Sequence, residues 1–125
     1  MLKQGRGSII NIGSIGGWNS LGRHHMPYGT AMGAVIQMTR ELSTEWAARG
    51  VRVNCICPGF FPAEQNRKVL TQERVDAIMA GTPMKRFGEP EELIGALLLL
   101  VAPKAGQFIT GTHINVDGGF TAAWF

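Results

Sequence analysis

The chain has 125 residues, of which 45% are hydrophobic and 17% charged, the composition of one ordinary folded domain over residues 1–125. Its net charge of +3 is spread along the sequence without a block of like charges, which argues against a nucleic-acid-binding surface. The longest apolar run, 97–102, is far shorter than the ~20 residues that cross a bilayer, so no membrane partner is expected.

The first predicted element is a buried strand at 9–12, because this short run is rich in β-branched residues. Ser14 follows it in a glycine-rich loop. Apolar residues at helical spacing then predict a helix from Tyr28 to Arg49. Pro27 suits the first turn of this helix, and Gly50 suits its C-terminal cap.

The next segment, 51–57, alternates in polarity and predicts a second strand that ends at Pro58-Gly59. Cys55 and Cys57 are the only cysteines, and on a strand this spacing points both to the same face. They have no distant cysteine to pair with and too few neighbouring ligands for zinc. We therefore expect core thiols, no metal site and a reduced, cytoplasmic protein.

Residues 60–84 carry a polar helical stretch at 71–80 between two connectors that contain proline, which indicates a lid over a binding site. A further helix is predicted from 88 to about 101, with proline and acids in its first turn. A third strand is predicted at 109–116. This alternation of strands and helices predicts an α/β fold with three parallel strands and flanking helices.

Ligands of open parallel sheets bind beyond the carboxyl ends of the strands, which here carry Ser14, Pro58-Gly59 and Asp117-Gly118. Ser14 and Tyr28 lie on the same crossover, so a hydroxyl and a phenol can converge on one carbonyl oxygen. The hydroxyl would orient that oxygen, and the phenol would exchange a proton with it. Asp117 is interpreted as a residue that orders the turn after the last strand.

Several motifs in a fixed order resemble the C-terminal half of a short-chain dehydrogenase/reductase. They are residues 7–14, 28–31, 51–54, 58–59, 86–92, 109–111 and 116–119. The resemblance implies a partial Rossmann-like, doubly wound fold and an NAD(P)-dependent oxidoreductase, with NAD or NADP as cofactor. Such an enzyme interconverts a carbonyl and a secondary alcohol of a small-molecule substrate.

In that family the residues matching Ser14 and Tyr28 are catalytic, and those matching Tyr28, Pro58, Gly59 and Phe61 contact the cofactor. The resemblance also makes 60–84 the substrate loop and implies a homo-oligomer, because family members associate through helices that flank the sheet. The segment 60–67 and the ending 118–120 are similar to members that act on sugar acids of the mannonate and fructuronate kind.

The chain departs from the family pattern in two ways. Met32 stands where the family has a lysine, which holds the nicotinamide ribose and whose charge eases ionisation of the tyrosine. No glycine-rich turn follows a first strand, so the nucleotide-binding half is predicted to be absent. The alternative is therefore a non-catalytic remnant or an oligomerising interaction module without cofactor, pairing through the exposed strand 9–12.

Basic side chains around the predicted lid, together with a histidine pair in the loop before Tyr28, leave a second choice open. They are His24, His25, Arg67, Lys68, Arg74, Lys85 and Arg86. The five arginines and lysines suit a carboxylate substrate, and a solvated basic face explains them equally well. The histidine pair either contacts substrate or is simply solvated.

Overall fold

The computed structural model describes residues 1–22, 24–62 and 70–123. Its centre is one sheet of parallel strands in the order β1-β2-β3. The strands are β1 (Gly7–Ile12), β2 (Val51–Pro58) and β3 (His113–Val116). The α/β class with three parallel strands and flanking helices is thus confirmed.

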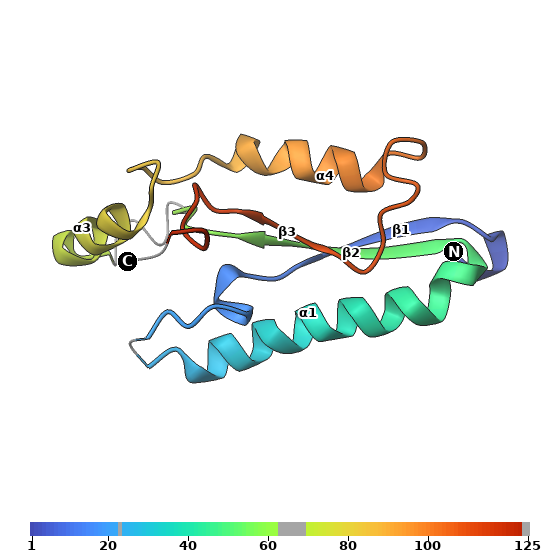
Figure 1. Cartoon of the computed structure of the whole chain (residues 1–125), viewed down its shortest axis with the longest axis horizontal. Helices are drawn as coiled ribbons and strands as arrows, with labels where there is room; N and C mark the ends of the chain where they lie inside the picture. The colour runs from blue at the N-terminus through green and yellow to red at the C-terminus, as the bar shows by residue number, and fades with distance from the viewer. Residues whose placement is uncertain (23, 63–69, 124–125) are drawn as a thin grey trace.

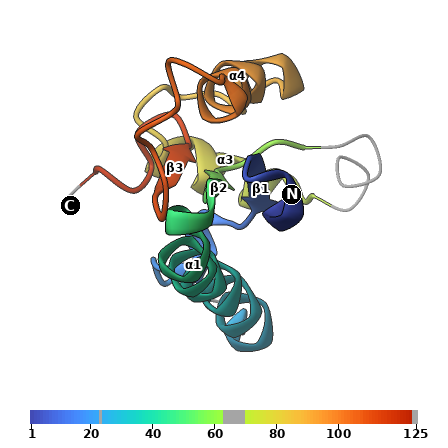
Figure 2. The same ribbon diagram turned by 90° about the vertical axis from the view of Figure 1, so that its right-hand side faces the viewer.

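Helices cover both faces of the sheet. They are α1 (Met26–Trp46), α3 (Gln72–Gly81) and α4 (Ile94–Val101), with short 3-10 helices η1 (Leu2–Gln4), η2 (Ile15–Gly17), η3 (Ala47–Arg49) and η4 (Pro90–Leu93). In Figure 1, α1 runs along one face of the sheet and α4 along the other. Figure 2 looks along the sheet and shows the three layers, α1, the strands and α4. None of the described helices is long and apolar enough to cross a membrane.

The first crossover follows its prediction closely. Helix α1 starts two residues before Tyr28, has Pro27 in its first turn, and continues through η3 to Arg49. Gly50 caps it with φ 77°, and its backbone N–H donates to Ala47 O at 3.0 Å. Glycine suits this left-handed position because it has no Cβ.

The second crossover carries the predicted lid and the helix predicted from 88 to about 101. Thr71 caps α3, since its Oγ1 accepts a hydrogen bond from Arg74 N at 3.3 Å. The helix predicted from 88 begins as η4, where Glu92 accepts from Glu89 N at 2.9 Å, and continues as α4. Residues 63–69, which include Arg67 and Lys68, lie outside the described residues.

The third strand is shorter than predicted: only 113–116 of the segment 109–116 forms β3. Backbone hydrogen bonds from Gly111 N to Val53 O and from Cys55 N to Thr112 O persist in the remaining segment. The buried side chain of Asn54 adds to them, because it donates to Ile109 O (2.9 Å) and accepts from Thr112 N (3.2 Å). Between these two residues Gly111 has φ 75°, a left-handed conformation that interrupts an extended strand.

The core lies along β2. Its residues Val51, Val53, Cys55, Ile56 and Cys57 are at most 2% exposed. Ile36 of α1 packs against Cys55 and Cys57, and Leu100 of α4, the helix on the opposite face, is also fully buried. Strand β1 pairs only with β2 among the described residues, and its last residue, Ile12, is 62% exposed.

Candidate functional site

The carboxyl ends of the strands meet at one edge of the sheet. Ile12 pairs with Ile56, so Ser14 and Pro58, each two residues farther along, lie at the same level. Val116 pairs with Pro58, which brings Asp117 beside Gly59. The edge is the one toward which α3 and the start of α1 extend in Figure 1.

Ser14 is held firmly at this edge. Its side chain is buried and caps η2, where Oγ accepts a hydrogen bond from Gly16 N at 3.1 Å. A hydroxyl that accepts a backbone hydrogen bond still has its own proton to donate. Ser14 can therefore orient an oxygen atom of a bound molecule.

Tyr28 lies in the first turn of α1 and is 47% exposed. A Cβ added at Gly16 would lie 3.5 Å from Tyr28 Cε1 and 3.6 Å from Ser14 Oγ. Both side chains therefore lie close to the same glycine, where a larger residue would crowd them.

A cleft of about 440 Å³ opens next to Tyr28. It is lined by Gly16, Ser20, Leu21, Gly22, His24, His25, Met26, Tyr28, Gly29 and Thr30. No carboxylate occurs among these residues, and hydroxyl and imidazole groups provide their polar side chains. Ser14 adjoins the cleft through Gly16. This cleft is the candidate substrate site.

Met32 lies one helical turn after Tyr28, beside the loop that carries Ser14. A Cβ added at Gly17 would lie 2.7 Å from the carbonyl carbon of Met32, so loop and helix are in close contact here. A thioether carries no charge and donates no hydrogen bond. Position 32 thus adjoins the candidate site without supplying a cation.

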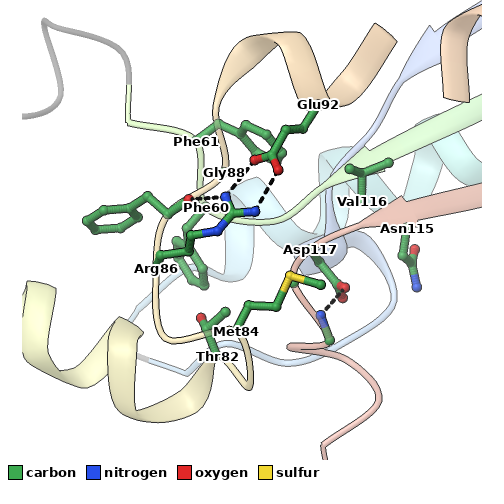
Figure 3. A pocket seen from close by; sticks show the side chains of 13 residues that line it. Phe60, Phe61, Thr82, Met84, Arg86, Gly88, Glu92, Asn115, Val116 and Asp117 are labelled. Atoms are coloured by element: carbon green, nitrogen blue, oxygen red, sulfur yellow. Dashed lines mark hydrogen bonds and ion pairs between the residues drawn. The ribbon is translucent and has the colours of Figure 1, made fainter. Parts of the chain in front are cut away.

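The residues after β2 pack against the turn after β3 and against Gly88. A Cβ at Gly59 would lie 2.7 Å from Asp117 Cα, so packing against Asp117 is enough to explain this glycine. The ring of Phe61 packs on Gly88, in a second cavity of about 390 Å³. Figure 3 shows Phe61 in this cavity beside Arg86 and Glu92.

The second cavity is bordered by an ion pair. Arg86 contacts both carboxylate oxygens of Glu92, at 2.7 and 2.6 Å, as Figure 3 shows. The hydrogen bond from Arg86, with a second from Glu89 N–H, lowers the pKa of Glu92 to about 2. Asp117 accepts from Gly119 N and Thr121 N at 2.9 Å each, which confirms that it orders the turn after β3.

One contact at the site escaped the sequence-based prediction. Arg74 Nη2 of α3 lies 3.1 Å from His25 Nε2, and the His25 ring meets Tyr28 edge-on with centroids 6.5 Å apart. The neighbouring His24 has φ 61°, a left-handed conformation uncommon outside glycine. The helix of the predicted lid therefore contacts the loop that precedes Tyr28.

The two cysteines pack in the core under this edge, with their Sγ atoms 3.8 Å apart and Ile36 against them. The interpretation as core thiols is confirmed. The hydrogen bond with Cys57 lowers the pKa of Cys55 to about 7. The pKa of Cys57 is raised by the same hydrogen bond and by burial, so the pair shares at most one negative charge.

Comparison with known proteins places these features in context. The family model described as enoyl-(acyl carrier protein) reductase matches residues 1–121. Galactitol 2-dehydrogenase (L-tagatose-forming) of Cereibacter sphaeroides is 41% identical over 97% of this chain and 48% of its own length. An inactive 2-(S)-hydroxypropyl-CoM dehydrogenase of Xanthobacter autotrophicus is 38% identical over 98% of this chain and 54% of its own.

A solved structure agrees in three dimensions. The gluconate 5-dehydrogenase of Burkholderia cenocepacia, crystallised with NADP and tartrate, has a TM-score of 0.90 and 36% identity. The match covers 98% of this chain and 48% of that one. The chain thus spans about half the length of the relatives that it matches.

Proposed function

Since the chain belongs to the short-chain dehydrogenase/reductase family, we propose that it carries the catalytic half of an NAD(P)-dependent oxidoreductase acting on a small carbonyl or secondary alcohol. The observation that carries the proposal is that Ser14 Oγ and the Tyr28 ring both lie close to Gly16, with Gly16 and Tyr28 lining a cleft. A hydroxyl near a half-exposed phenol suits carbonyl reduction, in which one group orients the substrate oxygen and the other donates a proton to it.

In this proposal Ser14 donates a hydrogen bond to the substrate oxygen and holds it next to the phenol. Tyr28 gives its proton to that oxygen during reduction and takes it back during alcohol oxidation. Half of the Tyr28 side chain is exposed, so it can exchange protons with water. A bound nicotinamide would supply or accept the hydride.

The residues present fit only part of a dinucleotide. Ser14, Tyr28 and the Pro58-Gly59 end of β2 lie at one edge of the sheet and would flank the nicotinamide, with Phe61 farther along the same segment. Met32 offers no donor to a ribose, and the sequence holds no G-x-G-x-x-G turn for a pyrophosphate. NAD and NADP are therefore proposed as cofactors of the whole enzyme, with weak binding by this chain.

A non-catalytic role is the alternative, and Met32 favours it. One relative, 38% identical, is itself named inactive. In this alternative Ser14 and Tyr28 are inherited residues, and the chain associates through β1, which has one free edge among the described residues. A homo-oligomer and a cytoplasmic location remain proposals that fit both functions.

The test is a titration of the purified chain with NADH and with NADPH, followed by nicotinamide fluorescence. We expect weak saturable binding that Met32→Lys strengthens, because a lysine at 32 adds a cation and hydrogen-bond donors one helical turn after Tyr28. Carbonyl reduction should then be measured with Tyr28→Phe as the control, which is expected to lower the rate about 10²–10⁴-fold. A folded chain that binds neither cofactor, with or without lysine at 32, would favour the non-catalytic alternative.

A further inference from the structure

The contact between Arg74 and His25 bears on the class of substrate. Both residues are partly buried, and His25 lines the cleft that Tyr28 faces. Because a guanidinium has donors and no acceptor, His25 must accept through Nε2 and carry its proton on Nδ1. The contact therefore holds one permanent positive charge at the edge of the cleft.

This charge has no carboxylate partner in the described parts of the chain. There, the Arg74 guanidinium hydrogen-bonds only to His25, and the single ion pair is Arg86–Glu92. The acid on α3 four residues after Gln72, Asp76, accepts from Gln72 Nε2 at 2.8 Å instead. A fork of five N–H donors thus has unused capacity for an anion.

The surroundings would strengthen that attraction. Arg74 also borders a small cavity of about 150 Å³ whose other lining residues are Leu21, Phe60, Ala77, Ile78 and Phe120. These side chains are all apolar, and charge-assisted hydrogen bonds are stronger where water is partly excluded. Leu21 lines both cavities, and Arg74, which borders the smaller one, contacts His25 of the larger one.

We propose that Arg74 and His25 bind the carboxylate of the substrate, which makes the substrate of this cleft a small polyhydroxy acid and not a neutral polyol. Arg74 donates to the carboxylate, and His25 positions the guanidinium while its ring edge contacts Tyr28. The hydroxyls of Ser20 and Thr30 in the same cleft suit the remaining hydroxyl groups. The inference rests on the proposed function, because it takes this cleft as the substrate site.

The relatives of the chain include enzymes named for a neutral polyol and enzymes named for a sugar acid. One is named for galactitol, a neutral polyol, and another for gluconate, an acid, with tartrate in its crystal. Identity of 41% and 36% does not separate the two classes. The Arg74 guanidinium in contact with His25 favours the acid, because a neutral polyol forms only weaker hydrogen bonds with a cation than a carboxylate does.

The test uses the whole chain with isotope-labelled histidine, and follows the His25 ring resonances by NMR during titration with D-gluconate or with sorbitol. We expect a saturable shift with gluconate and none with sorbitol at equal concentration. Arg74→Gln should weaken gluconate binding about tenfold or more, as loss of a charge-assisted hydrogen bond predicts. Arg74→Lys keeps the charge but loses the fork, and should weaken binding less.

Lys85→Gln is the matched control. Its ammonium donates to Ala80 O at 2.8 Å, so it lies by the end of α3 and does not line the cleft. Equal shifts with sorbitol, equal weakening by Lys85→Gln and Arg74→Gln, or no saturable shift would each overturn the inference. No cofactor is present in these titrations, so their failure is distinguishable from a failure of cofactor binding.

Discussion

Ile12 and Ile56 are neighbours in the sheet with very different surroundings. They form a register pair of β1 and β2, yet Ile12 is 62% exposed and Ile56 only 2%. Strand β2 has a partner on both sides and helices on both faces, whereas β1 has one partner among the described residues. The same side chain in the same type of strand is thus core in one and surface in the other.

This difference indicates that the stability of the fold depends mainly on β2, whereas the candidate site depends on the end of β1. Strand β2 holds most of the fully buried side chains, including Cys55 and Cys57. Strand β1, which is less buried, leads directly into Ser14 and the cleft. Substitutions in β2 should therefore change folding, and substitutions near the end of β1 should change the site.

The largest expected difference is in thiol reactivity. In the native chain Cys55 and Cys57 should react with a disulfide reagent only through unfolding, about 10³-fold or more slower than a free thiol. The cysteine of Ile12→Cys should react at nearly the rate of a free thiol. Stopped-flow absorbance measures both rates, and equal rates would refute the contrast between the strands.

Truncating the paired isoleucines gives a second difference. Ile56→Ala should lower the free energy of unfolding by about 2–4 kcal/mol, because it empties a filled core position. Ile12→Ala should lower the free energy of unfolding by less than about 1 kcal/mol, because most of the Ile12 side chain is already exposed to solvent. Urea denaturation followed by circular dichroism provides both values. Similar losses would mean that β1 is covered in solution.

A third difference between the strands concerns the glycine that precedes each of them. Gly50, before β2, has φ 77° and a Cβ there would collide with the carbonyl oxygen of Gly5. Gly5, before β1, has φ 65° and open space around it. Gly50→Ala should cost more than about 2 kcal/mol, and Gly5→Ala about 1 kcal/mol for the left-handed backbone alone. Thermal unfolding of the two variants checks the order.

The smallest effect concerns an ion pair outside both strands. Glu92 has its pKa lowered to about 2 in the folded chain, from an ordinary value of 4.5. The stability that it adds is therefore present above about pH 4.5 and is lost as pH falls toward 2. Glu92→Gln should reduce the acid sensitivity of unfolding slightly, because the pair is exposed. Glu91→Gln, which leaves the ion pair intact, is the control.

Local sequence signals predicted most of the fold. Helical spacing located α1, and Gly50 marked the end of its final turn because a left-handed cap favours glycine. The third strand was overestimated, because the left-handed Gly111 interrupts it and Asn54, more than fifty residues away, bonds to its first half. No periodicity reports such a long-range side-chain contact.

The candidate site was predictable in part for the same reason. Ser14 and Tyr28 follow one strand and begin one helix, so their approach follows from the crossover itself. The contact between His25 and Arg74 joins two crossovers and depends on how α3 packs. The direction of the Phe61 ring likewise depends on Gly88, in a different segment.

The crossover through α1 also has a consequence for how fast the chain folds. Gly7 pairs with Val51, and the whole of α1 lies between β1 and β2 in the sequence. The two strands therefore cannot pair residue by residue from a tight turn, as the strands of a hairpin do. The segment between the strands must lose conformational entropy before the β1–β2 hydrogen bonds can form. This loss slows folding relative to proteins whose contacts are mostly local. We expect α1 to be structured in the transition state, since its formation brings the ends of β1 and β2 together.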